Sequence, residues 1–152
     1  MRTAIFGLIA CALIAAPAAA QENISLQSSV FIEHTSRDAD GRNTRQIEPA
    51  AQLERGDRVV LLLDWQSGER NNAFMVTTPI PESMRFRGSG HATEAVSVDG
   101  GRSWGELGEL RIRENGQSRL ASASDVTHVR WRISSREAAR GSGRIAFSAI
   151  VR

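Results

Sequence analysis

The chain has 152 residues, 41% of them hydrophobic, which is enough for one domain with a buried core of its own. Its 19 basic residues are all arginines and stand against 17 acidic residues, so the small net charge predicts no specific nucleic-acid partner. Cys11 is the only cysteine, which excludes a disulfide scaffold and leaves the rest of the chain without a cysteine ligand or nucleophile.

Residues 1–20 have the pattern of a secretory signal peptide. Arg2 precedes an apolar run that ends at Pro17, and the small-residue tail Ala18-Ala19-Ala20 follows. We therefore expect this segment to be cleaved. The mature protein would then be a single domain over 21–152, located in the periplasm or outside the cell.

A lipid anchor is the alternative for the same segment. Leu8-Ile9-Ala10-Cys11 fits the spacing of a bacterial lipobox, in which the cysteine carries the lipid. No later run approaches the roughly 18 apolar residues of a membrane-spanning helix. We therefore expect no transmembrane segment in the mature chain.

Short alternating segments separated by turn residues follow the signal. They predict an all-β fold, an Ig-like antiparallel β-sandwich of about seven to nine strands. The first strand is expected over 24–34, with Ile24, Leu26, Val30 and Ile32 on one face, and the polar stretch 36–46 is expected to be a loop. Asp38, Asp40 and Gly41 in that loop resemble the start of a calcium site. The remaining ligands are missing, so a solvated turn is predicted.

The strongest strand signal lies over 58–66, after the turn Arg55-Gly56-Asp57. Every second residue from Val59 to Trp65 is apolar, and Val60 and Leu62 make the opposite face apolar as well. A strand with two apolar faces is expected to be central in its sheet or partly covered.

Six further strands are expected in the second half of the chain, over 73–78, 84–87, 94–98, 108–114, 126–134 and 144–151. Pro79 and Pro81 end the first of them. Glycines mark turns at Asp99-Gly100-Gly101, Asn115-Gly116 and Gly141-Ser142-Gly143, and 135–140 predicts one helical turn. The inward faces are expected to carry Thr127, Val129, Trp131 and Ile133 on one strand and Ile145, Phe147, Ala149 and Val151 on the other.

Four short blocks resemble the bacterial DUF11-type conserved repeat domain, an Ig-like module of secreted and surface proteins. They are ERGDRVV at 54–60, PIP at 79–81 followed by MRF and GS at 84–86 and 88–89, VSVDGGRSW at 96–104, and DVTHVRW at 125–131 with GSG at 141–143. Leu61 or Leu62 replaces a common aromatic residue, Thr78 replaces an aspartate, and 24–46 shows no likeness. The resemblance implies an extracytoplasmic structural or interaction module without a reaction or a cofactor.

One of these blocks also resembles the Asp-box of sialidase-like propellers. Ser97, Asp99, Gly101, Ser103 and Trp104 match the pattern S-x-D-x-G-x-[ST]-W. Propellers repeat such a motif in several blades, whereas this chain has one copy. The block therefore predicts a hairpin in which Asp99 accepts turn amides, and not a catalytic acid.

No catalytic, cofactor or metal residue is predicted. His34, His91 and His128 are far apart and form no metal-binding motif, and His128 is expected on the strand face opposite Trp131. No nucleophile elbow is predicted, because the pattern G-x-S-x-G occurs once, at 101–105, inside the hairpin block and without a helix signal after it. A hydrolase stays open as an alternative if two carboxylates with perturbed pKa values meet in a deep pocket.

Three Arg-apolar-Arg triplets are the remaining candidate binding residues: Arg85 and Arg87, Arg111 and Arg113, Arg130 and Arg132. On a strand, each triplet places two guanidinium groups on one face. If two such strands are neighbours, their arginines form a patch for an anionic glycan or a lipopolysaccharide core. Otherwise they are solvent-facing residues bridged to acids such as Glu33, Glu109 or Glu114.

These patterns favour an exported, noncatalytic structural or interaction module of the bacterial cell envelope. Its expected partner is an envelope protein or an anionic glycan. Binding of the glycan through the Arg-x-Arg strands is the alternative function, and a hydrolase with an unrecognised site is a weaker one.

Overall fold

The structure is a computed structural model that describes residues 24–68 and 72–152. The expected signal peptide over 1–20 and the lipobox cysteine lie outside the described residues. Within the described ranges, no helix is long and apolar enough to cross a membrane. Every strand ladder is antiparallel, and a single short helix is the only other regular element there, so the predicted all-β sandwich is confirmed.

The larger sheet has five strands in the order β2-β1-β3-β10-β5, with the bounds β2 Asn43–Pro49, β1 Ile24–Arg37, β3 Arg58–Ser67, β10 Ser142–Val151 and β5 Met84–Ser89. Strand β3 is its centre, as its two apolar faces predict. Val59 and Leu63 are buried on the inner face, and Val60 and Leu62 are half-buried on the outer face.

The smaller sheet has the order β4-β9-β6, with β4 Phe74–Pro79, β9 His128–Ile133 and β6 Glu94–Ser97. Pro79 ends an edge strand, where a missing N–H costs no ladder hydrogen bond. A separate hairpin joins β7 Arg111–Glu114 to β8 Gln117–Leu120 through Asn115 and Gly116, both with positive φ. Helix α1, Ser135–Ala138, begins with a capping box between Ser134 and Glu137.

The core lies between the two larger sheets. Trp131 and Ile133 of β9 are fully buried against Phe147 of β10, and the Trp131 and Phe147 ring centroids are 5.6 Å apart. Phe86 of β5 packs on the other side of Phe147, at 6.3 Å between centroids. The alternation predicted for 126–134 and 144–151 therefore faces inward as expected.

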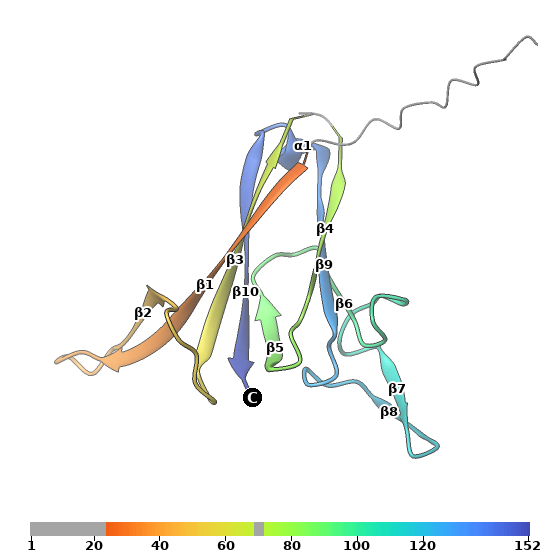
Figure 1. The fold of residues 1–152 in the computed structure, drawn as a ribbon, viewed down its shortest axis with the longest axis horizontal. Coiled ribbons are helices and arrows are strands. Elements are labelled where there is room, and N and C mark those ends of the chain that lie inside the picture. Colours follow the sequence, from red (N-terminus) through yellow and green to blue (C-terminus); the bar gives the residue numbers. More distant parts are fainter. Residues whose placement is uncertain (1–23, 69–71) are drawn as a thin grey trace, which may run out of the picture.

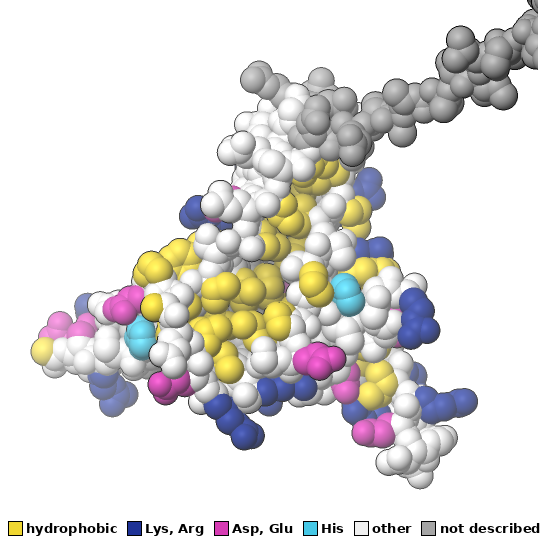
Figure 2. Space-filling view, viewed as in Figure 1, with side chains coloured by type: hydrophobic (Ala, Val, Ile, Leu, Met, Phe, Trp, Pro, Cys, Tyr) yellow, Lys and Arg dark blue, Asp and Glu magenta, His cyan; other side chains and the backbone are white. Residues whose placement is uncertain are grey.

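Figure 1 shows a wedge: the two larger sheets lie close together near α1 and diverge toward the opposite end. The β1–β2 hairpin and the β7–β8 hairpin extend from the two lower corners. Figure 2 shows hydrophobic side chains over the middle of this view and arginines mostly along its margins.

The prediction of a loop over 36–46 is wrong, because β2 pairs with β1 from Arg37 opposite Asn43 to Phe31 opposite Pro49. All residues of β2 are exposed, so no burial pattern marks it in the sequence. A tight turn sets the pairing instead: Arg42 N donates to Asp38 Oδ1 at 2.7 Å. A smaller error is β8, which was not expected as a strand.

Candidate functional site

The three Arg-x-Arg strands lie in three different sheets. Arg85 and Arg87 are on β5 of the larger sheet, Arg130 and Arg132 on β9 of the smaller sheet, and Arg111 and Arg113 on β7 of the separate hairpin. No two of these strands are neighbours, so the adjacency on which the six-arginine hypothesis depended is not met. A role of these residues in anion binding stays a prediction.

Two of the six arginines are held by contacts within the fold. The Arg130 guanidinium lies over the Trp104 ring, 4.4 Å from its centroid, in a cation–π contact. Arg111 Nε donates to Ser118 Oγ at 2.9 Å across the β7–β8 hairpin. Among the described residues, none of the six arginines has an ion pair with the expected acids: Glu33 pairs with Arg45, Glu114 pairs with Arg119, and Glu109 forms no ion pair with any of the six.

A basic pocket lies on the outer face of the larger sheet. Its volume is about 360 Å³, and three arginines and one carboxylate line it: Arg45 of β2, Arg58 of β3, Arg87 of β5 and Glu33 of β1. We call this pocket, with these four residues, the basic pocket. Gly88, Ser89, Gly90 and Ser148 also contribute to its walls.

A β-bulge helps to place Arg87 in this pocket. Ser148 of β10 faces Gly88 and Ala149 faces Phe86, so Arg87 is the extra residue between two paired positions. A bulge redirects the side chain of its unpaired residue. The next residue, Gly88, has a φ of +140°, a backbone conformation that glycine adopts readily because it has no Cβ.

The charge of the basic pocket is unbalanced. Glu33 Oε1 lies 3.6 Å from Arg45 Nε, and the Glu33 side chain is only 12% exposed. Among the residues described, neither Arg58 nor Arg87 has an ion pair or a side-chain hydrogen bond. Two guanidinium groups therefore line one pocket without a carboxylate partner of their own, and guanidinium groups bind carboxylate, sulfate or phosphate groups.

The Asp-box block forms a closed loop over 97–104 whose polar atoms bind one another. Asp99 Oδ1 accepts from Ser97 Oγ at 2.8 Å, and Asp99 Oδ2 accepts from Ser103 Oγ at 2.6 Å. The backbone N–H groups of Arg102 and Ser103 also donate to Oδ1. These bonds, the one from the Ser103 hydroxyl above all, hold the pKa of Asp99 well below its usual range.

Two further features fix the shape of the same loop. Gly101, with φ of +89°, allows the turn, and its carbonyl accepts from Trp104 Nε1 at 2.9 Å. Asp99 is therefore ionised and fully used within the loop, as the sequence predicts for a structural hairpin.

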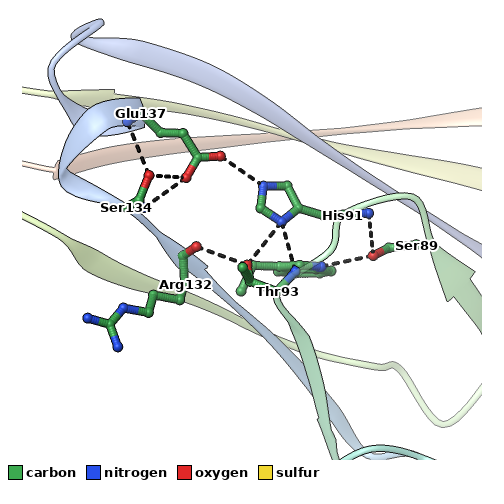
Figure 3. A network of polar contacts seen from close by, with 7 residues as sticks. Ser89, His91, Thr93, Arg132, Ser134 and Glu137 are labelled. Carbon is green, nitrogen blue, oxygen red and sulfur yellow. Dashed lines mark hydrogen bonds and ion pairs between the residues drawn. The ribbon is translucent and has the colours of Figure 1, made fainter.

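A polar network ties His91 to α1 (Figure 3). His91 Nε2 lies 3.3 Å from Glu137 Oε1, and His91 Nδ1 lies 3.0 Å from Thr93 Oγ1. Ser134 Oγ donates to Glu137 Oε2 at 2.6 Å, and this bond is the main reason why the pKa of Glu137 is lowered. The Ser134 hydroxyl thus binds the carboxylate and not the imidazole, so it is not placed as an activated nucleophile.

The other two histidines lie elsewhere. His128 is on the opposite face of β9 from Trp131, as expected, and its ring meets Trp104 edge-on at 6.4 Å. His34 lies 4.0 Å from Glu48 across the β1–β2 hairpin. In the part of the chain that the structure describes, no group of three or more His, Cys, Asp or Glu residues could hold a metal ion.

Two carboxylates do share one pocket. Glu94 and Glu106 line a hollow of about 330 Å³ beside β6, and Glu94 Oε2 is buried there without a hydrogen-bond donor. No hydroxyl or imidazole side chain lines this hollow together with them. The hollow therefore brings together two carboxylates, the pair of groups on which the hydrolase alternative depends.

Comparison with protein-family models, curated proteins and solved structures finds no match to this chain. The likeness to the DUF11-type repeat therefore rests on its short motifs. The basic pocket, which the sequence did not reveal, is the arrangement with the clearest binding chemistry.

Proposed function

We propose that the protein is an exported, noncatalytic interaction module that binds anionic groups in the basic pocket. The observation that carries this proposal is the pair Arg58 and Arg87, which face one concave surface without a carboxylate partner. Exposed arginines occur elsewhere on the chain. What distinguishes these two is that separate strands of one rigid sheet hold them toward the same space.

The chemistry of the pocket suits an oxyanion. Guanidinium groups stay charged at every physiological pH and donate two parallel hydrogen bonds to a carboxylate, sulfate or phosphate. The Ser148 hydroxyl in the wall offers a further donor. Glu33 is paired with Arg45, so its negative charge is directed toward the β2 side of the pocket.

The location proposed for this activity is the bacterial envelope or the cell exterior. The signal-like residues 1–20 and the likeness to the DUF11-type repeat support it. Uronic-acid or sulfated polysaccharides and phosphorylated lipopolysaccharide cores carry the required anions in that setting, and an envelope protein with an acidic surface would carry carboxylates.

Retention on a heparin column tests the proposal. The double variant Arg58→Ala/Arg87→Ala is expected to elute at much lower salt than the wild type, because both unpaired cations are lost. Arg113→Ala/Arg132→Ala removes the same charge from exposed positions on β7 and β9 and is the matched control. Far-UV circular dichroism checks that both variants fold.

Two results would contradict the proposal. The pocket variant could elute with the wild type, which would show that the basic pocket does not bind the anion. The control could lose as much retention as the pocket variant, which would show that the column senses net charge and no particular site.

A further inference from the structure

A second pocket lies on the same outer face of the larger sheet as the basic pocket. Its volume is about 420 Å³, and its polar lining consists of Gln27 of β1, Asp64 and Gln66 of β3, and Ser142 and Arg144 of β10. We call it the amide pocket. Both pockets involve the central strands β3 and β10.

One continuous track joins the two pockets. Along β3, every second residue from Arg58 to Gln66 points to the outer face, and β10 runs beside it with Ser148 opposite Val60 and Ala146 opposite Leu62. At about 3.3 Å per residue, the track from Arg58 to Gln66 is roughly 26 Å long. This length is far greater than a single small anion needs.

The middle of the track is apolar and uncovered. Phe31, Val60 and Leu62 are half-buried on the outer face, although they belong to β1 and β3, which both have a neighbouring strand on each side. Central strands usually bury such residues under another layer. Here they stay open to a ligand that presents apolar surface to them.

The two ends of the track differ in charge. At the basic end, Arg58 and Arg87 are unpaired. At the amide end, Arg144 Nε donates to Asp64 Oδ1 at 2.6 Å, and this bond lowers the pKa of Asp64. The remaining polar groups of the amide end are uncharged amides and a hydroxyl. The ligand that fits therefore carries an acid group at one end and neutral hydrogen-bonding groups at the other.

A sugar chain satisfies this track better than a peptide does. The backbone N–H and C=O groups of β3 are used in ladders with β1 and β10, so a peptide laid on the face would find no backbone partners for its own amides. Sugar hydroxyls can instead pair with glutamine and serine side chains, and the C–H faces of the rings can pack on Val60 and Leu62.

We infer that the ligand is an acidic polysaccharide that lies along β3 and β10, with an acid group in the basic pocket and following sugar units over Val60 and Leu62 toward the amide pocket. This inference rests on the proposed function and names the ligand class of that same site. It requires that affinity grow with chain length and that the amide pocket contribute to this growth.

Isothermal titration with two series of oligosaccharides tests the inference, one of oligogalacturonates and one of heparin fragments, each from the shortest unit to long chains. For the wild type, affinity per chain should rise about tenfold or more with length in at least one series, because later units bind an already anchored chain. The series that shows the rise identifies carboxylate or sulfate as the acid group.

The variant Gln27→Ala/Gln66→Ala separates the track from the basic pocket. It should bind the shortest unit as the wild type does and lose most of the gain with length. Gln46→Ala/Gln117→Ala, two exposed glutamines on β2 and β8, is the matched control and should keep the whole gain. Statistical rebinding of a long polyanion would raise affinity in all three proteins alike, so the variant distinguishes it from a track.

Four outcomes would overturn the inference. Equal affinity for short and long chains, with normal heparin retention, would show that the ligand does not extend along β3 and β10, and the proposed function would still stand. An undiminished gain in Gln27→Ala/Gln66→Ala would place the extra contacts elsewhere. A gain of the same size with poly-glutamate that the glutamine variant abolishes would assign the track to an acidic peptide. Loss of binding to every probe would contradict the proposed function as well.

Discussion

The Asp-box loop and the basic pocket are both rich in charged and polar residues, but they differ in how those groups are satisfied. In the loop, both carboxylate oxygens of Asp99 accept hydrogen bonds from residues within four positions of it. In the pocket, Arg58 and Arg87 face a shared space without a partner in the described ranges. The polar groups of the loop are therefore used within the fold, whereas the two arginines of the pocket are free to bind a ligand.

The two regions also differ in how a substitution should act. A change in the loop should lower stability and spare anion binding, whereas a change at Arg58 or Arg87 should do the reverse. Substitutions in each region can test this separation.

Asp99→Ala should have the largest effect. It removes the acceptor of several hydrogen bonds and leaves the Ser97 hydroxyl, which is fully buried, without its acceptor. We expect Tm to fall on the order of 10 °C, with heparin retention unchanged at a temperature where the variant is folded. Asp40→Ala in the exposed β1–β2 turn is the control and should leave Tm almost unchanged. An equal Tm for Asp99→Ala and the wild type would show that the loop does not contribute to the fold.

Ser89→Ala should come next. Ser89 lines the basic pocket, but its Oγ accepts from Trp131 Nε1 at 3.0 Å, and Trp131 is fully buried. Without this acceptor, the free energy of unfolding should fall by about 1–3 kcal/mol. Urea denaturation measures the loss. Ser148→Ala, at another position in the lining of the pocket, should leave stability near the wild-type value, and similar losses in both variants would mean that Trp131 gains nothing from Ser89.

Glu137→Gln should have a smaller effect that depends on pH. The Ser134 hydroxyl and, to a lesser degree, His91 hold the pKa of Glu137 below its usual 4.5, so the folded state favours the carboxylate. That stabilisation is present above pH 4.5 and is lost as pH falls through the lowered folded-state pKa. The variant should therefore be slightly less stable than the wild type at neutral pH, and the difference should shrink toward about pH 3.

The quantity to compare is the difference in free energy of unfolding between Glu137→Gln and the wild type. Asp99 and Asp125 also have lowered pKa values, so acid destabilises both proteins and the two values cannot be judged separately. Urea denaturation at the two pH values gives the difference. A difference in the free energy of unfolding that is the same at both pH values would show that the charge of Glu137 does not contribute to stability.

Glu33→Gln should have the smallest effect, and its sign is the opposite of the arginine variants. It removes the only carboxylate from the basic pocket and so should raise the affinity for anions by a few-fold. Elution from heparin at higher salt would show the gain. Glu48→Gln, on the neighbouring strand and outside the pocket, changes the charge by the same amount and should shift elution less. An unchanged or earlier elution for Glu33→Gln would argue against a pocket with unbalanced charge.

The sequence alone predicts the sandwich and the Asp-box loop because both depend on local patterns. Val129, Trp131 and Ile133 alternate at the period of a strand, and the loop is completed by residues between Ser97 and Trp104. Local chemistry also marks the helical turn that begins at Ser135. Strand β2 escaped prediction because its exposed residues carry no burial pattern.

The basic pocket could not be predicted in the same way. Glu33, Arg58 and Arg87 come from distant parts of the chain, and the strand order brings them together. The spacing of Arg85 and Arg87 predicts two side chains on one face of a regular strand, whereas the bulge at Arg87 breaks that regularity. Arg58 belongs to no triplet, and nothing in its local sequence separates it from an ordinary residue that follows a turn.

The central claim, that Arg58 and Arg87 bind an oxyanion together, is tested most directly by an NMR titration of ¹⁵N-labelled protein with galacturonate. We expect saturable shifts of the Arg58 and Arg87 side-chain Nε–H signals and of the neighbouring Gly88 and Ser89 amides, with Arg113 and Arg132 unchanged. Shifts of equal size at all exposed arginines, or no saturable shift at Arg58 and Arg87, would contradict it.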